Sequence, residues 1–324
     1  MTSAIILRSH GGPERLQLEQ AALSDPGPGE LRVRHLAIGV NFHDIYVRSG
    51  LYRTLALPGI PGIEASGVVE DVGPGVRDFA PGDRICYVTG SYGAYAAQRN
   101  LPDNLALKLP DAVDHETAAA TILKGLTACM LLRREYPVKV GDHILVHAAA
   151  GGVGQLLCRW AGHLGAVVIG TVGDTRKEAV ARAAGAAHVF SSADRDLVTK
   201  VMEITRGQGV AVAYDSVGRD SFQTSLSSLS YFGKLVNFGQ SSGPVPPFEV
   251  SQLAARSNSL SRPIIFHYLR DPVALRQMAA EVFALIGRGV LKADIGLRLP
   301  LAEAAEAHVR LEGRRTIGST ILLP

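Results

Sequence analysis

A glycine-rich turn near the middle of the chain carries the strongest chemical signal in the sequence. Residues 147–154 read HAAAGGVG, with Ala149 in the place of the first glycine of a G-x-G-x-x-G pattern and Gly151 and Gly154 in the other two. Such a turn lets the backbone approach a pyrophosphate and directs the N–H groups of a helix N-terminus at it. A lone match also occurs in turns without a ligand, but here an apolar strand precedes the turn and a helical pattern follows. The sequence therefore predicts a dinucleotide site.

The next expected strand ends in TVGDTRK over residues 171–177, and this end bears on the choice between NADP and NAD. Gly173 leaves room there, and Arg176 and Lys177 are suited to binding a 2′-phosphate. Asp174 opposes this, because an acidic residue near this position bonds the ribose 2′-hydroxyl of NAD. The alternative interpretation takes Arg176 and Lys177 as the solvated first turn of a helix. We expect NADPH as the cofactor and leave NADH open.

The hydrophobic pattern predicts the elements that would position these residues. From residue 143 onward, short apolar strands alternate with helices of about ten residues, which indicates a parallel sheet. The first 110 residues instead show short alternating runs broken by Pro and Gly, which is typical of antiparallel β structure in a partly closed barrel. Helices are expected over 114–134, with Asp114 as the cap, and over 272–287. The final apolar run, from Ser319, is expected to return to the N-terminal part.

Composition narrows the classes of function. The 324 residues include 33 Lys and Arg and 30 Asp and Glu, a net charge of +3 that does not favour a nucleic acid partner. Hydrophobic residues make up 47% of the chain, which is enough for a large core. No apolar run approaches the roughly 20 residues of a membrane helix, and Cys86, Cys129 and Cys158 form no CxxC pair. We expect a cytoplasmic protein that binds neither nucleic acid nor membrane.

Six further motifs carry a resemblance that extends over nearly the whole chain. They read NFHDIYVRSGLY at 41–52, PGIEASGVVEDVG at 61–73, PGDR at 81–84, LKGLT at 123–127, YDSVGR at 214–219 and FGQSSG at 238–243. Together with the glycine-rich turn, they resemble the zinc-free, ζ-crystallin-like quinone oxidoreductases of the medium-chain dehydrogenase/reductase superfamily. The resemblance implies an NADPH:quinone oxidoreductase that acts on a small-molecule quinone and forms a homodimer.

The resemblance also implies an α/β fold of two domains. A GroES-like, β-rich catalytic domain is expected over 1–122 and 267–324, and a Rossmann domain with a doubly wound parallel sheet over 123–266. Together with the turn and strand end described above, the family's motifs assign the cofactor to Phe42, Asp44, Tyr46, Met130, Gly151, Gly152, Val153, Gly154, Gly173, Arg176, Lys177, Ser192, Val217, Phe238, Gly239, Gln240, Ser241, Pro263, Ile264, Ile265 and Arg314. Ser192 stands where relatives often carry a Tyr, and Met130 where they often carry an aromatic residue. Ser192 and Asp174 both weaken the expectation of a strict NADPH preference.

A second set of positions is expected to line the acceptor site and to take part in the reaction: Asn41, Tyr46, Tyr52, Lys124 and Thr127. Tyr46 or Tyr52 is suited to hydrogen-bond a carbonyl oxygen as charge develops on it, and the alternative is that both rings only form an aromatic wall. Zinc enzymes of the superfamily use a Cys near position 41, a Gly-His-Glu and a lobe of four cysteines. This chain instead has Asn41, Gly62-Ile63-Glu64 and no cysteine cluster, so we expect no metal.

Other functions compete with quinone reduction. Reduction of α,β-unsaturated carbonyls would use the same cofactor, and a non-catalytic NADPH-binding protein would carry the same cofactor motifs. The run from Gly239 to Gly243 fits the G-x-S-x-G nucleophile elbow of hydrolases, with Ser241 as the nucleophile. An elbow leads directly into a helix, whereas Pro244 follows here, so a serine hydrolase is not expected.

Overall fold

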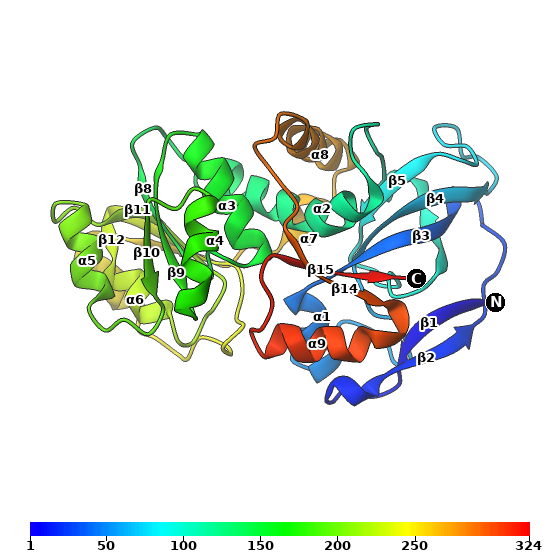
Figure 1. Ribbon diagram of the computed structural model, residues 1–324, viewed down its shortest axis with the longest axis horizontal. Helices are drawn as coiled ribbons and strands as arrows, with labels where there is room; N and C mark the ends of the chain where they lie inside the picture. Colours follow the sequence, from blue (N-terminus) through cyan, green and yellow to red (C-terminus); the bar gives the residue numbers. More distant parts are fainter. The chain divides into compact units, whose positions relative to one another are not determined.

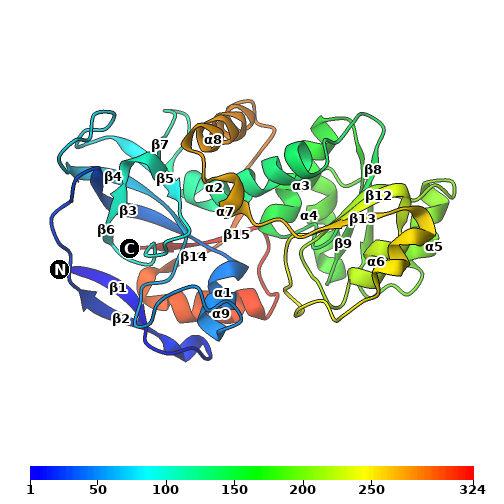
Figure 2. The same cartoon turned by 180° about the vertical axis from the view of Figure 1, so that it is seen from behind.

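The computed structural model describes residues 1–324, which divide into two compact units. The first unit contains Met1–Leu123 and Leu269–Pro324, and the second contains Lys124–Tyr268. The course of the chain through both units can be followed by colour in Figures 1 and 2. No helix of the structure is both long enough and apolar enough to cross a membrane.

The second unit is built on a parallel sheet of six strands in the order β10-β9-β8-β11-β12-β13. Its strands are β8 (His143–Val146), β9 (Val167–Val172), β10 (His188–Ser191), β11 (Val210–Asp215), β12 (Leu229–Asn237) and β13 (Ser259–Ser261). In order along the chain this is the 3-2-1-4-5-6 arrangement of doubly wound folds. The strand order reverses between β8 and β11, which is the point where such sheets bind ligands outside the carboxyl ends of their strands.

Helices cover both faces of this sheet, with α3 and α4 on one side and α5 and α6 on the other (Figure 1). The helices of the second unit are α3 (Gly152–His163), α4 (Glu178–Ala183), α5 (Leu197–Ile204), α6 (Phe222–Ser227) and α7 (Ile265–Tyr268). A core cluster under α5 and α6 includes Leu145, Ile169, Val201, Phe222 and Leu235. Because both faces are covered, the central strands are continuous apolar runs, which is the pattern that predicted the parallel sheet.

The first unit contains a seven-stranded sheet and a separate hairpin of β1 and β2. Its strands are β1 (Thr2–Leu7), β2 (Leu16–Ala21), β3 (Glu30–Val40), β4 (Glu64–Val72), β5 (Arg84–Val88), β6 (Gln98–Pro102), β7 (Ala106–Lys108), β14 (Ile295–Pro300) and β15 (Ser319–Leu323). Its helices are α1 (Phe42–Ser49), α8 (Pro272–Gly287) and α9 (Ala304–Glu312), and α2 (His115–Cys129) continues into the second unit. The α/β fold class predicted from the sequence is confirmed.

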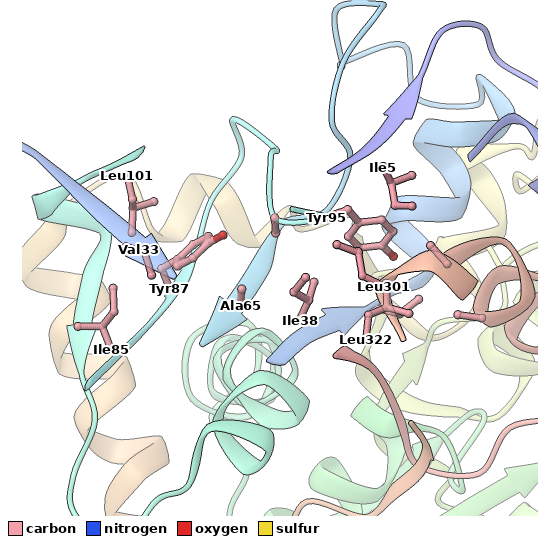
Figure 3. Packing of buried hydrophobic residues seen from close by; sticks show 14 of the residues in the cluster. Ile5, Val33, Ile38, Ala65, Ile85, Tyr87, Tyr95, Leu101, Leu301 and Leu322 are labelled. Atoms are coloured by element: carbon pink, nitrogen blue, oxygen red, sulfur yellow. The ribbon is translucent and has the colours of Figure 1, made fainter. Parts of the chain in front are cut away.

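The eleven-residue strand β3 organises the sheet of the first unit. It pairs with β4 along one edge, while its other edge pairs with β6 near its start and with β15 near its end. The pairing of β15 with β3 confirms that the final apolar run returns to the N-terminal part. The inward side chains form one apolar cluster, in which Val33, Ile38, Tyr87, Leu101 and Leu322 can be seen in Figure 3.

Two helices differ from the expectations. Helix α1 lies within the region that was expected to be entirely β structure. Its start is marked by Asn41, whose N–H donates to Asp44 Oδ2 at 2.8 Å, and its end by Gly50 at φ 85°, two ordinary helix-end signals. Helix α2 begins after Asp114, whose carboxylate accepts from Thr117 N at 2.8 Å as predicted, but the chain widens into a π-helix over Met130–Glu135.

Candidate functional site

The glycine-rich turn links β8 to α3 and is built around the carbonyl of Ala148. Ala148 has φ 51°, and its oxygen accepts a 2.9 Å hydrogen bond from Gly151 N. A Cβ on Gly154 would lie 2.2 Å from this oxygen, so only glycine fits there. Helix α3 begins at Gly152 with Gly151 as its cap, and no side chain caps its first N–H groups. The backbone cradle and the helix N-terminus fit the pyrophosphate of a dinucleotide.

The alanine at the first glycine position is accommodated by a glycine on the next strand. Ala149 is fully buried and its N–H donates to Thr171 O at 2.9 Å. A Cβ on Gly170 of β9 would lie 2.8 Å from the methyl group of Ala149. The side chain that the turn gains at position 149 therefore fills the space that position 170 leaves empty. The departure from the glycine pattern does not distort the turn.

The end of β9 holds the residues that were expected at the 2′-phosphate. A Cβ on Gly173 would meet only Ser192 Oγ, at 3.9 Å, so this end of the strand is open. Arg176 turns its guanidinium onto Asp174, with Nε 2.9 Å and Nη2 2.5 Å from Oδ2, and the Arg176 backbone N–H also donates to this carboxylate. These hydrogen bonds lower the pKa of Asp174 to about 2. Asp174 therefore offsets the charge of Arg176, and Lys177 follows directly in the same turn.

A buried polar network shapes the carboxyl end of β11. The carboxylate of Asp215 accepts from Val217 N at 2.8 Å and Gly218 N at 3.0 Å, and Ser225 Oγ donates to its second oxygen at 3.2 Å. His147 joins its Nε2 to Ser225 Oγ at 2.9 Å. Burial lowers the pKa of His147, so the imidazole is held neutral. The network ties the residue that opens the glycine-rich turn to the turn that carries Val217.

A second turn, after β12, is hydrogen-bonded to the first. Phe238 N donates to Asp215 O at 2.8 Å, Ser241 N to Ser216 O at 3.2 Å and Ser242 N to Val217 O at 2.9 Å. The structure thus brings Val217 together with four other predicted cofactor positions in consecutive order, Phe238, Gly239, Gln240 and Ser241. A nucleophile elbow requires a helix directly after its serine, and no helix follows Ser241 directly. The run from Gly239 to Gly243 is therefore not a nucleophile elbow.

The remaining predicted site residues of this unit lie in two places, and Lys124 and Thr127 among them were assigned to the acceptor. Pro263 and Ile264 line a hollow of about 390 Å³ together with Glu135, Arg262 and Tyr268, and Ile265 begins α7. Lys124 and Thr127 follow one another at helical spacing on α2, with exposures of 5% and 8%, and Met130 comes three residues later with 1%. A cofactor contact for Met130 stays a prediction.

In the first unit, Asn41 caps α1 and faces Glu64 of β4. Asn41 Nδ2 donates to Glu64 Oε1 at 2.8 Å, and Leu123 N donates to Glu64 Oε2 at 2.9 Å. Glu64 and Asp44 are fully buried. Asp44 accepts from Asn41 N at the start of α1 and, at 3.2 Å, from the hydroxyl of Tyr95, so its carboxylate both caps the helix and joins it to Tyr95. These hydrogen bonds do not test the predicted contact of Asp44 with the cofactor, which stays a prediction.

The predicted aromatic residues of α1 and the following segment lie together. The ring centroids of Tyr46 and Tyr52 are 5.1 Å apart with an interplanar angle of 63°, and the Phe42 ring is 6.2 Å from that of Tyr46. All three are half-buried. His43 and Tyr92 extend this group and were missed in the sequence, although NFHDIY places an aromatic residue at each of 42, 43 and 46. Arg314 lies in the turn after α9 with φ 54°.

The side chains of this structure do not form the set of ligands that a zinc ion requires. Within residues 1–324, no group of three or more His, Cys, Asp and Glu side chains is arranged to hold a metal ion. The carboxylate of Glu64 is already hydrogen-bonded to an amide side chain and a backbone N–H. That no metal is needed stays a prediction, which requires a measurement on the protein.

Comparisons with known proteins agree with this geometry. Residues 27–111 match the alcohol dehydrogenase GroES-like domain, and residues 152–282 match the zinc-binding dehydrogenase family. The chain is 45% identical to a quinone oxidoreductase of Pseudomonas aeruginosa, with both chains fully covered. It is 40% identical to a 2-haloacrylate reductase of a Burkholderia species, over 100% of this chain and 99% of that protein.

A solved structure gives the same result in three dimensions. The crystal structure of Escherichia coli quinone oxidoreductase complexed with NADPH has a TM-score of 0.97 and 43% identity, covering 99% of this chain and 100% of that chain. The predicted GroES-like and Rossmann architecture and the predicted family are confirmed. The chain belongs to the quinone oxidoreductase family of the medium-chain dehydrogenase/reductase superfamily.

Proposed function

We propose that this protein is an NADPH-dependent quinone reductase. The observation that carries the proposal is the cradle formed by Ala148, Gly151 and Gly154 at the start of α3, in a chain 43% identical over its full length to a quinone oxidoreductase solved with NADPH. NADPH supplies the hydride when it is bound. The protein's part is to orient the cofactor, bind the acceptor and limit access of water.

Each unit has a role in this proposal. In the second unit, the first-turn N–H groups of α3 bind the pyrophosphate, and Lys177 is the main cation for the 2′-phosphate because Asp174 engages Arg176. The remaining cofactor assignments made from the sequence, including Ser192 and Arg314, are proposed in the same sense. We also propose that the catalytic domain predicted over 1–122 and 267–324 corresponds to the first unit, and the dinucleotide-binding domain predicted over 123–266 to the second, whose bounds differ from the prediction by one or two residues.

The acceptor is bound by the side chains that the sequence pointed to. Tyr46 and Tyr52 present phenol groups suited to donate to an acceptor oxygen as negative charge develops. Asn41, Lys124 and Thr127 add polar groups, and the amide of Asn41 is oriented by Glu64. Replacing both tyrosines with Phe tests the role of the hydroxyl groups as donors. If they donate, turnover should fall while the affinity for NADPH is retained. Unchanged turnover would mean that the two rings only form an aromatic wall of the site.

A second candidate substrate class is supported by a specific relative. The 2-haloacrylate reductase from Burkholderia is 40% identical over the full chain, and its name describes reduction of an activated carbon–carbon double bond. An α,β-unsaturated carbonyl accepts a hydride at carbon with the negative charge on oxygen, so the same phenol donors would serve. A protein that binds NADPH without turnover is the non-catalytic alternative.

The exposed edge of the second unit's sheet and the three cysteines bear on assembly and location. We propose a homodimer, since Tyr231 and Phe232 on β12 are 68% and 80% exposed and β13 leaves one edge of its sheet unpaired. Light scattering should give twice the chain mass of 34.3 kDa. We propose a cytoplasmic location, because all three cysteines are buried free thiols. Fractionation of cells tests this.

The first experiment is oxidation of NADPH and NADH with 1,4-benzoquinone, 9,10-phenanthrenequinone and an enone, each with and without EDTA. Rapid quinone reduction that EDTA does not change supports a metal-independent quinone reductase. Faster turnover of the enone favours the second substrate class. Tight NADPH binding without turnover of any acceptor contradicts the enzyme proposal.

A further inference from the structure

The aromatic residues of the first unit form a continuous row that extends beyond the predicted acceptor residues. Tyr92 stacks on His43 at 5.9 Å with an interplanar angle of 26°, and His43 meets Tyr52 edge-on at 5.6 Å. Tyr52 in turn meets Tyr46 at 5.1 Å. Tyr92 is almost fully buried, whereas Tyr46 and Tyr52 are half-buried. The row therefore has an anchored end at Tyr92 and an accessible end at the two predicted acceptor residues.

A polar tie joins the anchored end to the segment that carries Tyr52. The hydroxyl of Tyr92 is 3.2 Å from His43 Nε2 and also hydrogen-bonds Thr54 Oγ1. Thr54 lies two residues after Tyr52 in a stretch without regular secondary structure. One backbone bond, from Tyr52 N to Tyr46 O at 2.9 Å, ties this stretch to α1. We call the group of His43, Tyr92 and Thr54 the Tyr52 clamp. Within it, His43 contacts the ring of Tyr52, and the hydrogen bond between Tyr92 and Thr54 restrains the backbone that carries this ring.

The backbone at Tyr92, which belongs to the Tyr52 clamp, is held by hydrogen bonds that do not involve Tyr52. Tyr92 has φ 60°, which non-glycine residues rarely adopt, and its carbonyl accepts from Arg99 Nη1 at 2.5 Å. The next residue, Gly93, donates its N–H to Ile60 O at 2.9 Å. Burial lowers the pKa of His43 to about 4, so the imidazole is neutral near neutral pH. The anchored end therefore does not depend on Tyr52 for its own position.

We propose that His43 is a positioning residue: through the Tyr52 clamp it holds the Tyr46–Tyr52 face in a fixed orientation, and its effect is therefore greater on flat aromatic quinones than on small acyclic acceptors. The inference rests on the proposed function and deepens it by naming a residue that positions the acceptor-binding face. A planar ring system gains from a fixed aromatic face by offset or edge-to-face contact, whereas an acyclic enone offers little area to such a face. Orientation of the face costs less on binding when the ring is already held in the free protein.

The test compares acceptors in H43A, H43F, Y92F and T54V. In H43A, KM for 9,10-phenanthrenequinone should rise about three- to tenfold and by a larger factor than KM for methyl vinyl ketone, while the Kd for NADPH stays unchanged. H43F keeps a ring beside Tyr52 but removes the nitrogen, so it should retain more quinone affinity than H43A. Y92F and T54V each break the polar tie and should raise the quinone KM in the same direction. Hydrogen exchange of the peptide over 50–57 should become faster in H43A.

Several results would overturn the proposal. An unchanged ratio of quinone to enone kcat/KM in H43A is one, and equal losses with both acceptors and with NADPH binding are another, since they indicate general damage. Slower quinone turnover in H43A without faster hydrogen exchange of the peptide over 50–57 would also contradict a positioning role of His43. If the unaltered protein reduces no acceptor, the proposed function fails separately, and the clamp is then tested by calorimetry with 9-fluorenone, which H43A should bind more weakly than the unaltered protein. Equal affinity would overturn it.

Discussion

Asn41 and Glu64 are joined by a 2.8 Å hydrogen bond from Nδ2 to Oε1, and the second carboxylate oxygen of Glu64 accepts from Leu123 N. This contact fixes which way the Asn41 amide points at the start of α1. It also connects α1, β4 and α2 through one fully buried carboxylate. A residue that the family motif presents as part of a binding site is therefore also a structural junction of the first unit.

Glu64→Gln should destabilise the protein because the new amide N–H₂ must face either Asn41 Nδ2 or Leu123 N, and both are donors. We expect a loss of about 1–3 kcal/mol in the free energy of unfolding, the cost of a buried donor without an acceptor. Urea denaturation measures it. The control is Glu70→Gln on the same strand, where an exposed ion pair with Arg34 at 2.8 Å should contribute under about 1 kcal/mol. Equal effects of the two changes would contradict this account.

Asp174→Asn should strengthen the preference for NADPH. The change removes a negative charge from the end of β9 and releases Arg176 from its carboxylate, so two cations become available to the 2′-phosphate. The Kd for NADPH, measured by fluorescence titration, should fall several-fold relative to that for NADH. Lys177→Gln should change the ratio in the opposite direction. A tighter complex with NADH in Asp174→Asn would show that Asp174 does not face the ribose.

Gly154→Ala should weaken NADPH binding and lower the melting temperature. Its Cβ would lie 2.2 Å from the Ala148 carbonyl oxygen, so the glycine-rich turn and the start of α3 must separate. We expect at least a tenfold increase in the Kd for NADPH, about 1.4 kcal/mol. Gly287→Ala is the matched control, since nothing lies within 4 Å of a Cβ at that helical position. Its melting temperature should stay the same or rise, because Ala favours a helix over Gly.

Stability should fall with decreasing pH below about 6.5, partly because of two buried histidines. Burial lowers the pKa of both His35 and His308 to about 3, while their pKa in the unfolded chain is near the usual 6.5. Above 6.5 both states bind no proton at these rings and their contribution is complete. Between 6.5 and 3 only the unfolded chain takes up protons, so each ring removes stability on the order of 1 kcal/mol per pH unit.

Urea denaturation from pH 7 to pH 5 measures this slope. His308→Gln should make the pH dependence shallower, even though the variant is less stable at pH 7 for lack of the Tyr95 hydrogen bond. His163→Gln, at an exposed position, should leave the slope as it is. The same slope in His308→Gln and in the unaltered chain would exclude His308 as a source of the pH dependence.

The sequence by itself determined the architecture and the place of the glycine-rich turn. Local patterns encode these features, because apolar period, glycine positions and helix caps act over a few residues. Asp114, the turn over 147–154 and the strands from β8 to β12 could be predicted in this way. The same helix-end signals mark α1, with Asn41 and Asp44 at its start and Gly50 at its end. They did not lead to a predicted helix because the Pro and Gly residues nearby favoured β structure.

Only the tertiary structure decided which distant side chains meet. His147 and Ser225 are 78 residues apart, Asn41 and Glu64 are 23 apart, and His43 and Tyr92 are 49 apart. No local pattern links such pairs, since their contact depends on strand order and on the path of irregular segments. The pairing of Arg176 with Asp174 is local, but it was not predictable because residue types do not specify side-chain rotamers. Local patterns thus encode the strands, the helices and the glycine-rich turn, while packing brings together the side chains proposed to bind the acceptor.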